Sequence, residues 1–141
     1  MADSDYAGDV SSKEAWEVLS RDPVAVLVDV RTDAEWAWVG LPDLSTLEKT
    51  PLLVPWQSFP NMQINPNFAA EIVAKGVRPE QTVFLICRSG QRSRHAAMAL
   101  CAAGYGQCFN VSDGFEGGHG AERHRGSTEG WKAAGLPWTQ G

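Results

Sequence analysis

A cysteine followed by a short polar loop is the strongest chemical signal in this 141-residue sequence. The loop runs from Cys87 to Ser93 and reads Cys-Arg-Ser-Gly-Gln-Arg-Ser. An apolar run ending at Ile86 precedes it and a segment with helical character follows. We therefore expect the thiol at the carboxyl end of a strand, where α/β proteins bind ligands. Backbone amides of such a loop, with the first amides of the helix behind it, can surround an anion and favour a nucleophilic thiolate at Cys87.

The other loop residues fit a role in binding an anionic substrate. Gly90 permits the positive φ that a tight turn with inward amides usually requires. Arg88 and Arg92 add positive charge, and either could bind an anionic sulfur donor or instead fix the loop through carbonyl and carboxylate contacts. These polar neighbours also predict an exposed thiol, although most free cysteines are buried. We expect the substrate to contact six residues: Arg88, Ser89, Gly90, Gln91, Arg92 and Ser93.

The remaining cysteines and the histidines give weaker signals. Cys101 and Cys108 are expected to be inert core thiols, because one lies on the packed face of a predicted helix and the other opens a strand. His95 lies just inside that helix, where its side chain should point outward rather than activate the thiol. His119 and His124 are expected to be solvated in a Gly-rich charged segment. We predict no metal site and no cofactor.

Apolar runs rich in β-branched residues predict strands, and the segments between them have helical character. Ser11 and Glu14 have the spacing of a capping box, and Pro23 ends the helix that they open. Gly104 is placed to end the helix after the cysteine loop. The alternation of strands and helices predicts an α/β domain with a mostly parallel sheet. The expected strands are residues 24–30, 52–54, 82–86 and 108–111, and the expected helices are residues 12–20, 32–38, 67–75 and 93–103.

Length and composition indicate one globular domain. The chain is 43% hydrophobic and 21% charged, and it is long enough for one continuous core but not for two. We expect a single domain over residues 1–141, with a loose N-terminal segment at 1–7 and an irregular insertion or lid at 114–130. The net charge of -5 argues against a nucleic-acid partner. No secretory signal or membrane span is evident, so we expect a cytoplasmic protein with no membrane partner.

Several phrases of the sequence resemble the rhodanese (thiosulfate sulfurtransferase) superfamily. The resemblance covers most of the chain, and the cysteine loop combined with an Asp-Val-Arg strand end is a specific feature. Residues 39–44 depart from the Gly-His-Ile phrase that many members have at this point. The matching phrases are Asp29-Val30-Arg31, Glu35-Trp36, the loop at 87–93, Gly104-Tyr105, Asn110-Val111, the turn at 113–117 and the closing phrase at 130–137.

The resemblance implies a single rhodanese-like domain with a central, mostly parallel sheet of about five strands flanked by helices. It implies a sulfurtransferase in which Cys87 takes the outer sulfur of a donor such as thiosulfate, becomes a persulfide, and passes the sulfur to cyanide or a thiol. Asp29 and Arg31 end a strand beside the loop and are expected to support the site. The expected partners are small sulfur-containing anions or thiols, with a sulfur donor or acceptor protein as a further option.

Two other functions stay open from the sequence alone. A persulfide carrier would need the same thiolate but would receive sulfur from a partner protein and turn over little thiosulfate. A phosphatase or arsenate reductase is disfavoured, because phosphatases related to this fold use a Cys-x5-Arg loop, whereas only four residues separate Cys87 from Arg92. The smaller ring of amides should suit a sulfur atom better than a tetrahedral phosphate.

Overall fold

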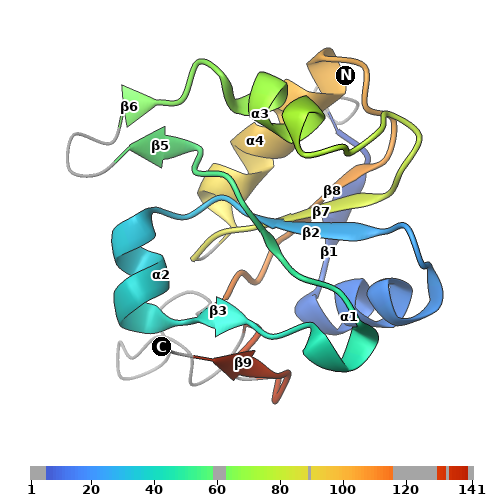
Figure 1. Ribbon diagram of the computed structural model, residues 1–141, viewed down its shortest axis with the longest axis vertical. Helices are drawn as coiled ribbons and strands as arrows, with labels where there is room; N and C mark the ends of the chain where they lie inside the picture. The colour runs from blue at the N-terminus through green and yellow to red at the C-terminus, as the bar shows by residue number, and fades with distance from the viewer. Residues whose placement is uncertain (1–5, 59–62, 89, 116–129, 133, 140–141) are drawn as a thin grey trace.

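A five-stranded parallel sheet forms the centre of the molecule (Figure 1). The computed structural model describes residues 6–58, 63–88, 90–115, 130–132 and 134–139. The strand order is β1-β8-β7-β2-β4, and every neighbouring pair is parallel. The predicted α/β class and mostly parallel sheet of about five strands are confirmed. The strands are β1 (Gly8–Val10), β2 (Val26–Asp29), β4 (Leu52–Leu53), β7 (Val83–Ile86) and β8 (Cys108–Val111).

Helices cover both faces of this sheet (Figure 1). The first helix and a short 3-10 helix lie on one face, the third and fourth helices lie on the other, and the second lies beyond the end of β2. Two small antiparallel pairs, β3 with β9 and β5 with β6, lie outside the central sheet. The helices are α1 (Ser12–Arg21), α2 (Asp33–Val39), η2 (Ser45–Leu47), α3 (Phe68–Ala74) and α4 (Gln91–Ala102). The short strands are β3 (Leu41–Pro42), β5 (Gln57–Ser58), β6 (Gln63–Ile64) and β9 (Trp138–Thr139).

The residues of β7 alternate between two hydrophobic clusters, one on each face of the sheet. Val83 and Leu85 belong to the cluster that includes residues of α3 and α4, whereas Phe84 and Ile86 belong to the cluster that includes residues of α1. All four side chains are buried. Burial on both faces explains why this strand is an unbroken apolar run in the sequence rather than an alternating one.

Helix ends follow the capping signals in the sequence. The Ser11 hydroxyl accepts from the amide of Glu14, and the Glu14 carboxylate accepts from the amide of Ser11, so the predicted capping box is confirmed. Gly104 has a φ of 108° just after α4, as expected of a helix-ending glycine. The start of α4 differs from the prediction. This helix begins at Gln91 rather than near residue 93, because Gly90 in the left-handed conformation is its N-cap.

Sequence patterns did not predict β1, the strand at one edge of the sheet. Its three residues include one large apolar side chain, Val10, which is too little for a periodic signal. Its pairing partner β8 lies far along the chain, and the register places Asp9 opposite Asn110. The amide of Ala7 donates to the Cys108 carbonyl at 2.9 Å and extends the pairing towards the N-terminus. An acidic side chain is therefore held beside β8.

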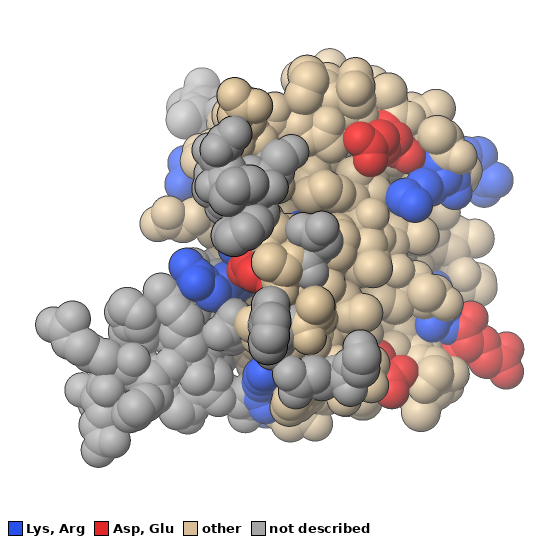
Figure 2. All heavy atoms as spheres, turned by 60° about the vertical axis from the view of Figure 1, so that its left-hand side comes forward, with Lys and Arg blue, Asp and Glu red and all other residues tan. Residues whose placement is uncertain are grey.

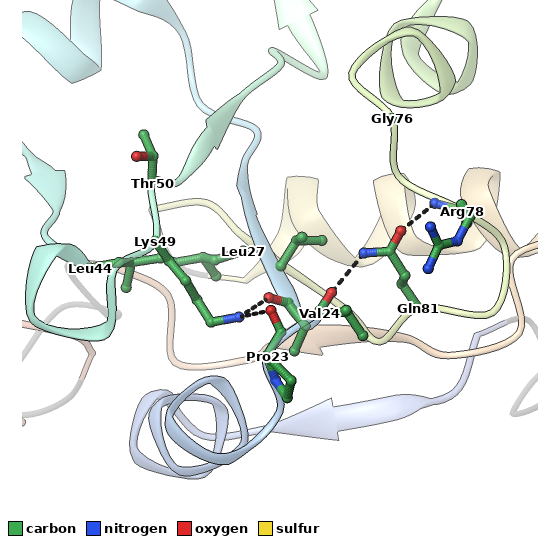
Figure 3. Close-up of a pocket in the computed structure, with 11 residues that line it drawn as sticks. Pro23, Val24, Leu27, Leu44, Lys49, Thr50, Gly76, Arg78 and Gln81 are labelled. Carbon is green, nitrogen blue, oxygen red and sulfur yellow. Dashed lines mark hydrogen bonds between the residues drawn. The ribbon is translucent and has the colours of Figure 1, made fainter.

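A lysine anchors the connection between β3 and β4 to the start of β2 (Figure 3). Lys49 Nζ donates at 2.7 to 3.1 Å to three backbone carbonyls, those of Asp22, Pro23 and Ala25. Burial lowers the pKa of this lysine. Gln81 donates to the Val24 carbonyl at 2.7 Å from the other side. Lys49, Gln81 and residues 23–25 line a cavity of about 340 Å³ that lies at the amino ends of β2 and β7, opposite the end that carries the cysteine loop.

Candidate active site

The loop after β7 wraps around the sulfur atom of Cys87. Sγ lies 3.1 Å from the amide nitrogen of Gly90 and 3.3 Å from that of Ser93. The Ser93 hydroxyl oxygen also lies 3.3 Å from the sulfur. On the other side, the Cys87 carbonyl accepts from the amide of Phe115 at 2.8 Å. Two inward amides thus converge on one sulfur atom, with a hydroxyl beside it, and the amides can stabilise negative charge there.

The expectation of an exposed thiol is wrong, because Cys87 is only 1% exposed. Its polar neighbours contribute backbone amides to the sulfur, and Ser93 is itself fully buried against it. Gly90 makes this close packing feasible. Its φ is 100°, and a Cβ at this position would lie 2.3 Å from the Ser112 carbonyl oxygen. Polar residue types in this loop therefore enclose the thiol instead of exposing it.

Arg92, at the start of α4, forms a two-bond ion pair with Glu35 of α2. The distances are 2.6 Å from Nη1 to Oε1 and 2.9 Å from Nη2 to Oε2. Glu35 Oε1 also accepts from the amide and the hydroxyl of Thr32, both at 3.1 Å. Burial raises the pKa of Glu35, but the hydrogen bonds and charge of Arg92 and the bonds from Thr32 outweigh it and lower the pKa to about 2. The pair is therefore charged at neutral pH and fixes α4 to α2.

The other predicted loop residues lie at the rim of the site. Arg88 and Gln91 are exposed, and Arg88 makes no hydrogen bond or ion pair with the residues that the structure describes. His95 is exposed as well, as predicted. Ser89 lies outside the described residues, as do His119, His124 and most of the predicted insertion at 114–130. Arg88 is thus the loop arginine that a solute can approach.

Asp29 and Arg31 form a fully buried ion pair at the end of β2. Arg31 Nη2 lies 2.6 Å from Asp29 Oδ2, and Nε lies 2.9 Å from Oδ1. Nη2 also donates to the Gly40 carbonyl at 2.7 Å, just after α2. The Arg31 guanidinium lies 4.4 Å from the centre of the Phe115 ring, and the amide of Phe115 is the one that donates to the Cys87 carbonyl. The ion pair therefore contacts the residues that flank the cysteine loop.

Residue types and spacing do not assign Asn110 and Asp9 to the site, whereas Glu35 has a local signal. Asn110 accepts from the Ser93 hydroxyl at 2.5 Å and donates to Asp9 at 3.0 Å. No spacing rule connects residues so far apart in the chain. The role of Glu35 could have been suspected, since Thr32-x-x-Glu35 has the spacing of a capping box, which the structure shows.

Cys108 lies far from the cysteine loop. It pairs with Val83 at the start of β7, and Cys87 lies four residues further along, about 13 Å away in the strand direction. Burial, with a smaller contribution from Cys101, raises the pKa of the Cys108 thiol to about 12. Cys101 is half-buried on α4, and all three cysteines are free. Cys108 is therefore a core thiol, as predicted, whereas Cys101 is only half-buried and does not belong to the core.

Charges of both signs occur on the face where the strands end (Figure 2). Lysine and arginine side chains form small separate groups there, with acidic side chains between them. Within the described ranges, no group of three or more His, Cys, Asp or Glu residues could hold a metal ion. No helix in those ranges is long and apolar enough to cross a membrane. Cys87, with the two amides that face its sulfur, is therefore the candidate nucleophile of this site.

The parallel sheet with a sulfur-enclosing loop after β7 defines a rhodanese-like domain, which confirms the resemblance found in the sequence. Residues 7–141 match the family model described as the STR4 middle domain, and the chain belongs to this family. It resembles Rv0390 from M. tuberculosis, whose crystal structure superposes with a TM-score of 0.89 at 49% identity over 96% of this chain and 99% of that one.

Two curated relatives differ in how much of their own length is matched. An uncharacterized protein of Rickettsia rickettsii is 39% identical over 129 residues, which cover 92% of this chain and 94% of that protein. The chloroplastic protein thylakoid rhodanese-like of Oryza sativa subsp. indica is 30% identical over 133 residues, which cover 94% of this chain but 25% of that protein. Together with the family match, the rhodanese-like relative supports a sulfur-related role at the level of the family.

Proposed function

We propose that this protein is a sulfurtransferase that carries sulfane sulfur as a persulfide on Cys87. The observation that supports this most directly is the convergence of the Gly90 and Ser93 amides on the sulfur at 3.1 and 3.3 Å. Donors in this position stabilise a thiolate before the reaction and the persulfide anion after it, as an oxyanion hole stabilises an oxyanion. The same amides can act in both half-reactions.

Each half-reaction breaks one sulfur–sulfur bond and forms one new bond to the transferred sulfur. In the first, the Cys87 thiolate attacks the outer sulfur of thiosulfate, the S–S bond of the donor breaks, and sulfite leaves with the bonding electron pair. In the second, cyanide or a thiolate attacks the outer sulfur of the persulfide and leaves as thiocyanate or a new persulfide. The Cys87 thiolate is restored, so the kinetics are ping-pong and no redox cofactor is needed.

The loop arginines have different roles in this proposal. Glu35 engages both terminal nitrogens of Arg92, which makes Arg92 a support for the loop. Arg88 is exposed and attracts the anionic donor to the rim. Ser89 and Gln91 complete the binding loop. Because Cys87 is buried, the donor must present a slender terminal sulfur, which thiosulfate does.

Mass spectrometry after incubation with thiosulfate tests the proposal. We expect an adduct of about 32 Da, the mass of one sulfur atom, on the peptide that contains Cys87. Adding cyanide should remove the adduct and release thiocyanate. Cys101→Ser is the matched control and should load normally. Retention of full sulfur transfer by Cys87→Ser would overturn the mechanism, whereas a persulfide formed with a protein donor but not with thiosulfate would indicate a carrier.

A further inference from the structure

A chain of hydrogen bonds connects Cys87 to the edge strand β1. Asn110 Nδ2 donates to Asp9 Oδ1 at 3.0 Å, and Asn110 Oδ1 accepts from the Ser93 hydroxyl at 2.5 Å. The same hydroxyl oxygen lies 3.3 Å from Cys87 Sγ. Ser93 is fully buried and Asn110 is 2% exposed, so water does not replace the contact between them. Through this series of hydrogen bonds, side chains on β1 and β8 determine how the Ser93 hydroxyl is oriented beside the sulfur.

The Ser93 hydroxyl has one hydrogen but two neighbouring acceptors, Asn110 Oδ1 and Cys87 Sγ. Asp9 fixes the orientation of the Asn110 amide, because Nδ2 must face the carboxylate and Oδ1 must then face Ser93. The shorter distance, 2.5 Å against 3.3 Å, places the hydrogen on the Asn110 side. A lone pair of the hydroxyl then faces the sulfur, where it can accept from a thiol S–H but repels a thiolate.

We propose that Asn110, held by Asp9, is a positioning residue that keeps the Ser93 hydroxyl away from Cys87 and so opposes thiolate formation in the resting protein. When the thiol releases its proton to solvent, the hydroxyl rotates towards the sulfur and Asn110 Oδ1 loses its hydrogen bond. No covalent bond other than S–H changes. The loss of that bond offsets part of the stabilisation that the loop amides give the thiolate. The inference rests on the proposed role of Cys87 as the nucleophile.

Charged groups also lie around the sulfur, and the variants of Ser93 and Asn110 leave them unchanged. Arg92 interacts electrostatically with both Cys87 and Asp29. Ser93 and Asn110 are uncharged, so substituting them leaves every nearby charge in place. The charged or titratable side chains on the elements packed around the sulfur include Arg88 in the loop, Arg92, Arg94 and His95 on α4, Glu35 on α2, Asp29 and Arg31 at the end of β2, and Asp9 on β1, which also accepts from the Tyr6 hydroxyl at 2.8 Å.

The test is the pH dependence of Cys87 alkylation by iodoacetamide, followed by peptide mass spectrometry so that each cysteine is counted separately. Asn110→Leu removes the competing acceptor, so the hydroxyl turns to the sulfur and the midpoint pH should fall by roughly 1 unit. In a Ser93→Ala background, Asn110→Leu should leave the midpoint unchanged, because there is no hydroxyl to withhold. Thr82→Val is the control. It removes one polar contact, to Gln107, at the other end of β7, and should not move the midpoint.

An unchanged or higher midpoint for Asn110→Leu overturns the proposal. The proposal is also overturned if Asn110→Leu lowers the midpoint equally in the wild-type and Ser93→Ala backgrounds. Alkylation needs no sulfur donor, so this readout is separate from sulfur transfer. If the dependence on Ser93 holds while thiosulfate loading fails, the proposed function is wrong and the role of Asn110 stands. If loading succeeds while the dependence is absent, only the role of Asn110 is wrong.

Variants of Asp9 test the anchor without disturbing the buried core, because Asp9 is exposed. Asp9→Asn removes the charge but keeps an acceptor for Asn110, whereas Asp9→Ala removes both. Without an acceptor, the Asn110 amide is free to turn its NH2 group to Ser93, which releases the hydroxyl to the sulfur. We expect a larger fall in the midpoint for Asp9→Ala than for Asp9→Asn. Equal shifts of the midpoint in Asp9→Ala and Asp9→Asn would mean that Asp9 acts only through its charge, which would overturn its role as the anchor of Asn110.

Discussion

Arg92 and Glu35 are 57 residues apart in the chain, yet their side chains meet in two hydrogen bonds of 2.6 and 2.9 Å. Each residue lies in the first turn of its helix, α4 for Arg92 and α2 for Glu35. The contact therefore joins the amino ends of two helices that border the same loop. Because the Ser93 amide that faces Cys87 lies in the first turn of α4, the junction holds the helix end that supplies this amide.

The junction should be sensitive to acid. The pKa of Glu35 is about 2 in the folded chain against an ordinary value of 4.5, so the pair stabilises the fold fully above pH 4.5 and loses this contribution as the pH falls towards 2. The difference corresponds to about 3 kcal/mol at most. In urea unfolding across this range, Glu35→Gln should be less stable than wild type at pH 6, and the two should converge near pH 2.

The exposed Arg78–Glu80 pair serves as the control for this experiment, since both side chains are more than half exposed. Glu80→Gln should change the unfolding free energy little at any pH. A gap between wild type and Glu35→Gln that stayed constant down to pH 2 would contradict the assigned role of the ion pair.

Gly90→Ala should disable the loop. A side chain here is strained by the φ of 100°, at about 1 to 2 kcal/mol, and its Cβ would lie 2.3 Å from the Ser112 carbonyl oxygen. We expect a large drop in the rate of persulfide formation from thiosulfate. Gly104→Ala is the matched control, because φ is 108° there but nothing lies within 4 Å of the added Cβ. Gly104→Ala should destabilise the fold slightly and form the persulfide at the wild-type rate. Equal rates in the two variants would contradict the claim that the tight packing at Gly90 is needed for persulfide formation.

Arg88→Gln should weaken the use of anionic donors. The arginine is exposed and is not engaged by the described residues, so its charge acts on the solute. We expect kcat/KM for thiosulfate to fall about tenfold at low salt and to become less sensitive to ionic strength. Arg94→Gln, which removes another exposed arginine from α4, should have little effect. Similar losses in both variants would point to overall charge rather than to a specific contact.

Arg31→Met should be strongly destabilising. It leaves the Asp29 carboxylate fully buried without its cation, a change that typically costs about 3 to 5 kcal/mol. Chemical denaturation measures this loss directly. The double variant Asp29→Leu with Arg31→Met should recover part of it, because no buried charge is left alone. Failure to recover any stability would mean that the contacts of Arg31 with Gly40 and Phe115 matter more than the charge pair.

The sequence was informative wherever the signal was local. Residues 82–86 were recognised as a strand because burial on both faces requires an apolar run, and the Ser11–Glu14 capping box depends on residues within one turn. In contrast, β1 gains its stability from pairing with a strand about a hundred residues later, and three residues carry no period. The start of α4 was misplaced because Gly90 acts as both a loop residue and a helix cap.

The candidate site also contains some residues with a local sequence signal and others that only the folded sheet brings together. Cys87 and its loop were identified from a contiguous phrase, but their polar composition suggested an exposed thiol, since composition does not distinguish inward amides from outward side chains. Asn110 and Asp9 reach the loop through the register between β8 and β1, which only the folded sheet determines. Contacts set by long-range register are beyond what residue types and spacing can indicate.

The enclosure of Cys87 by Gly90 and Ser93 affects the lifetime that a persulfide on this residue would have. A persulfide that is exposed to solvent reacts with almost any thiol, so its outer sulfur is soon transferred to unrelated acceptors. A persulfide enclosed by this loop would not react with bulky thiols. It would transfer its sulfur only to an acceptor whose reactive atom is slender enough to reach Cys87. The lifetime of the persulfide and the choice of its acceptor would then both follow from the burial of this one sulfur atom.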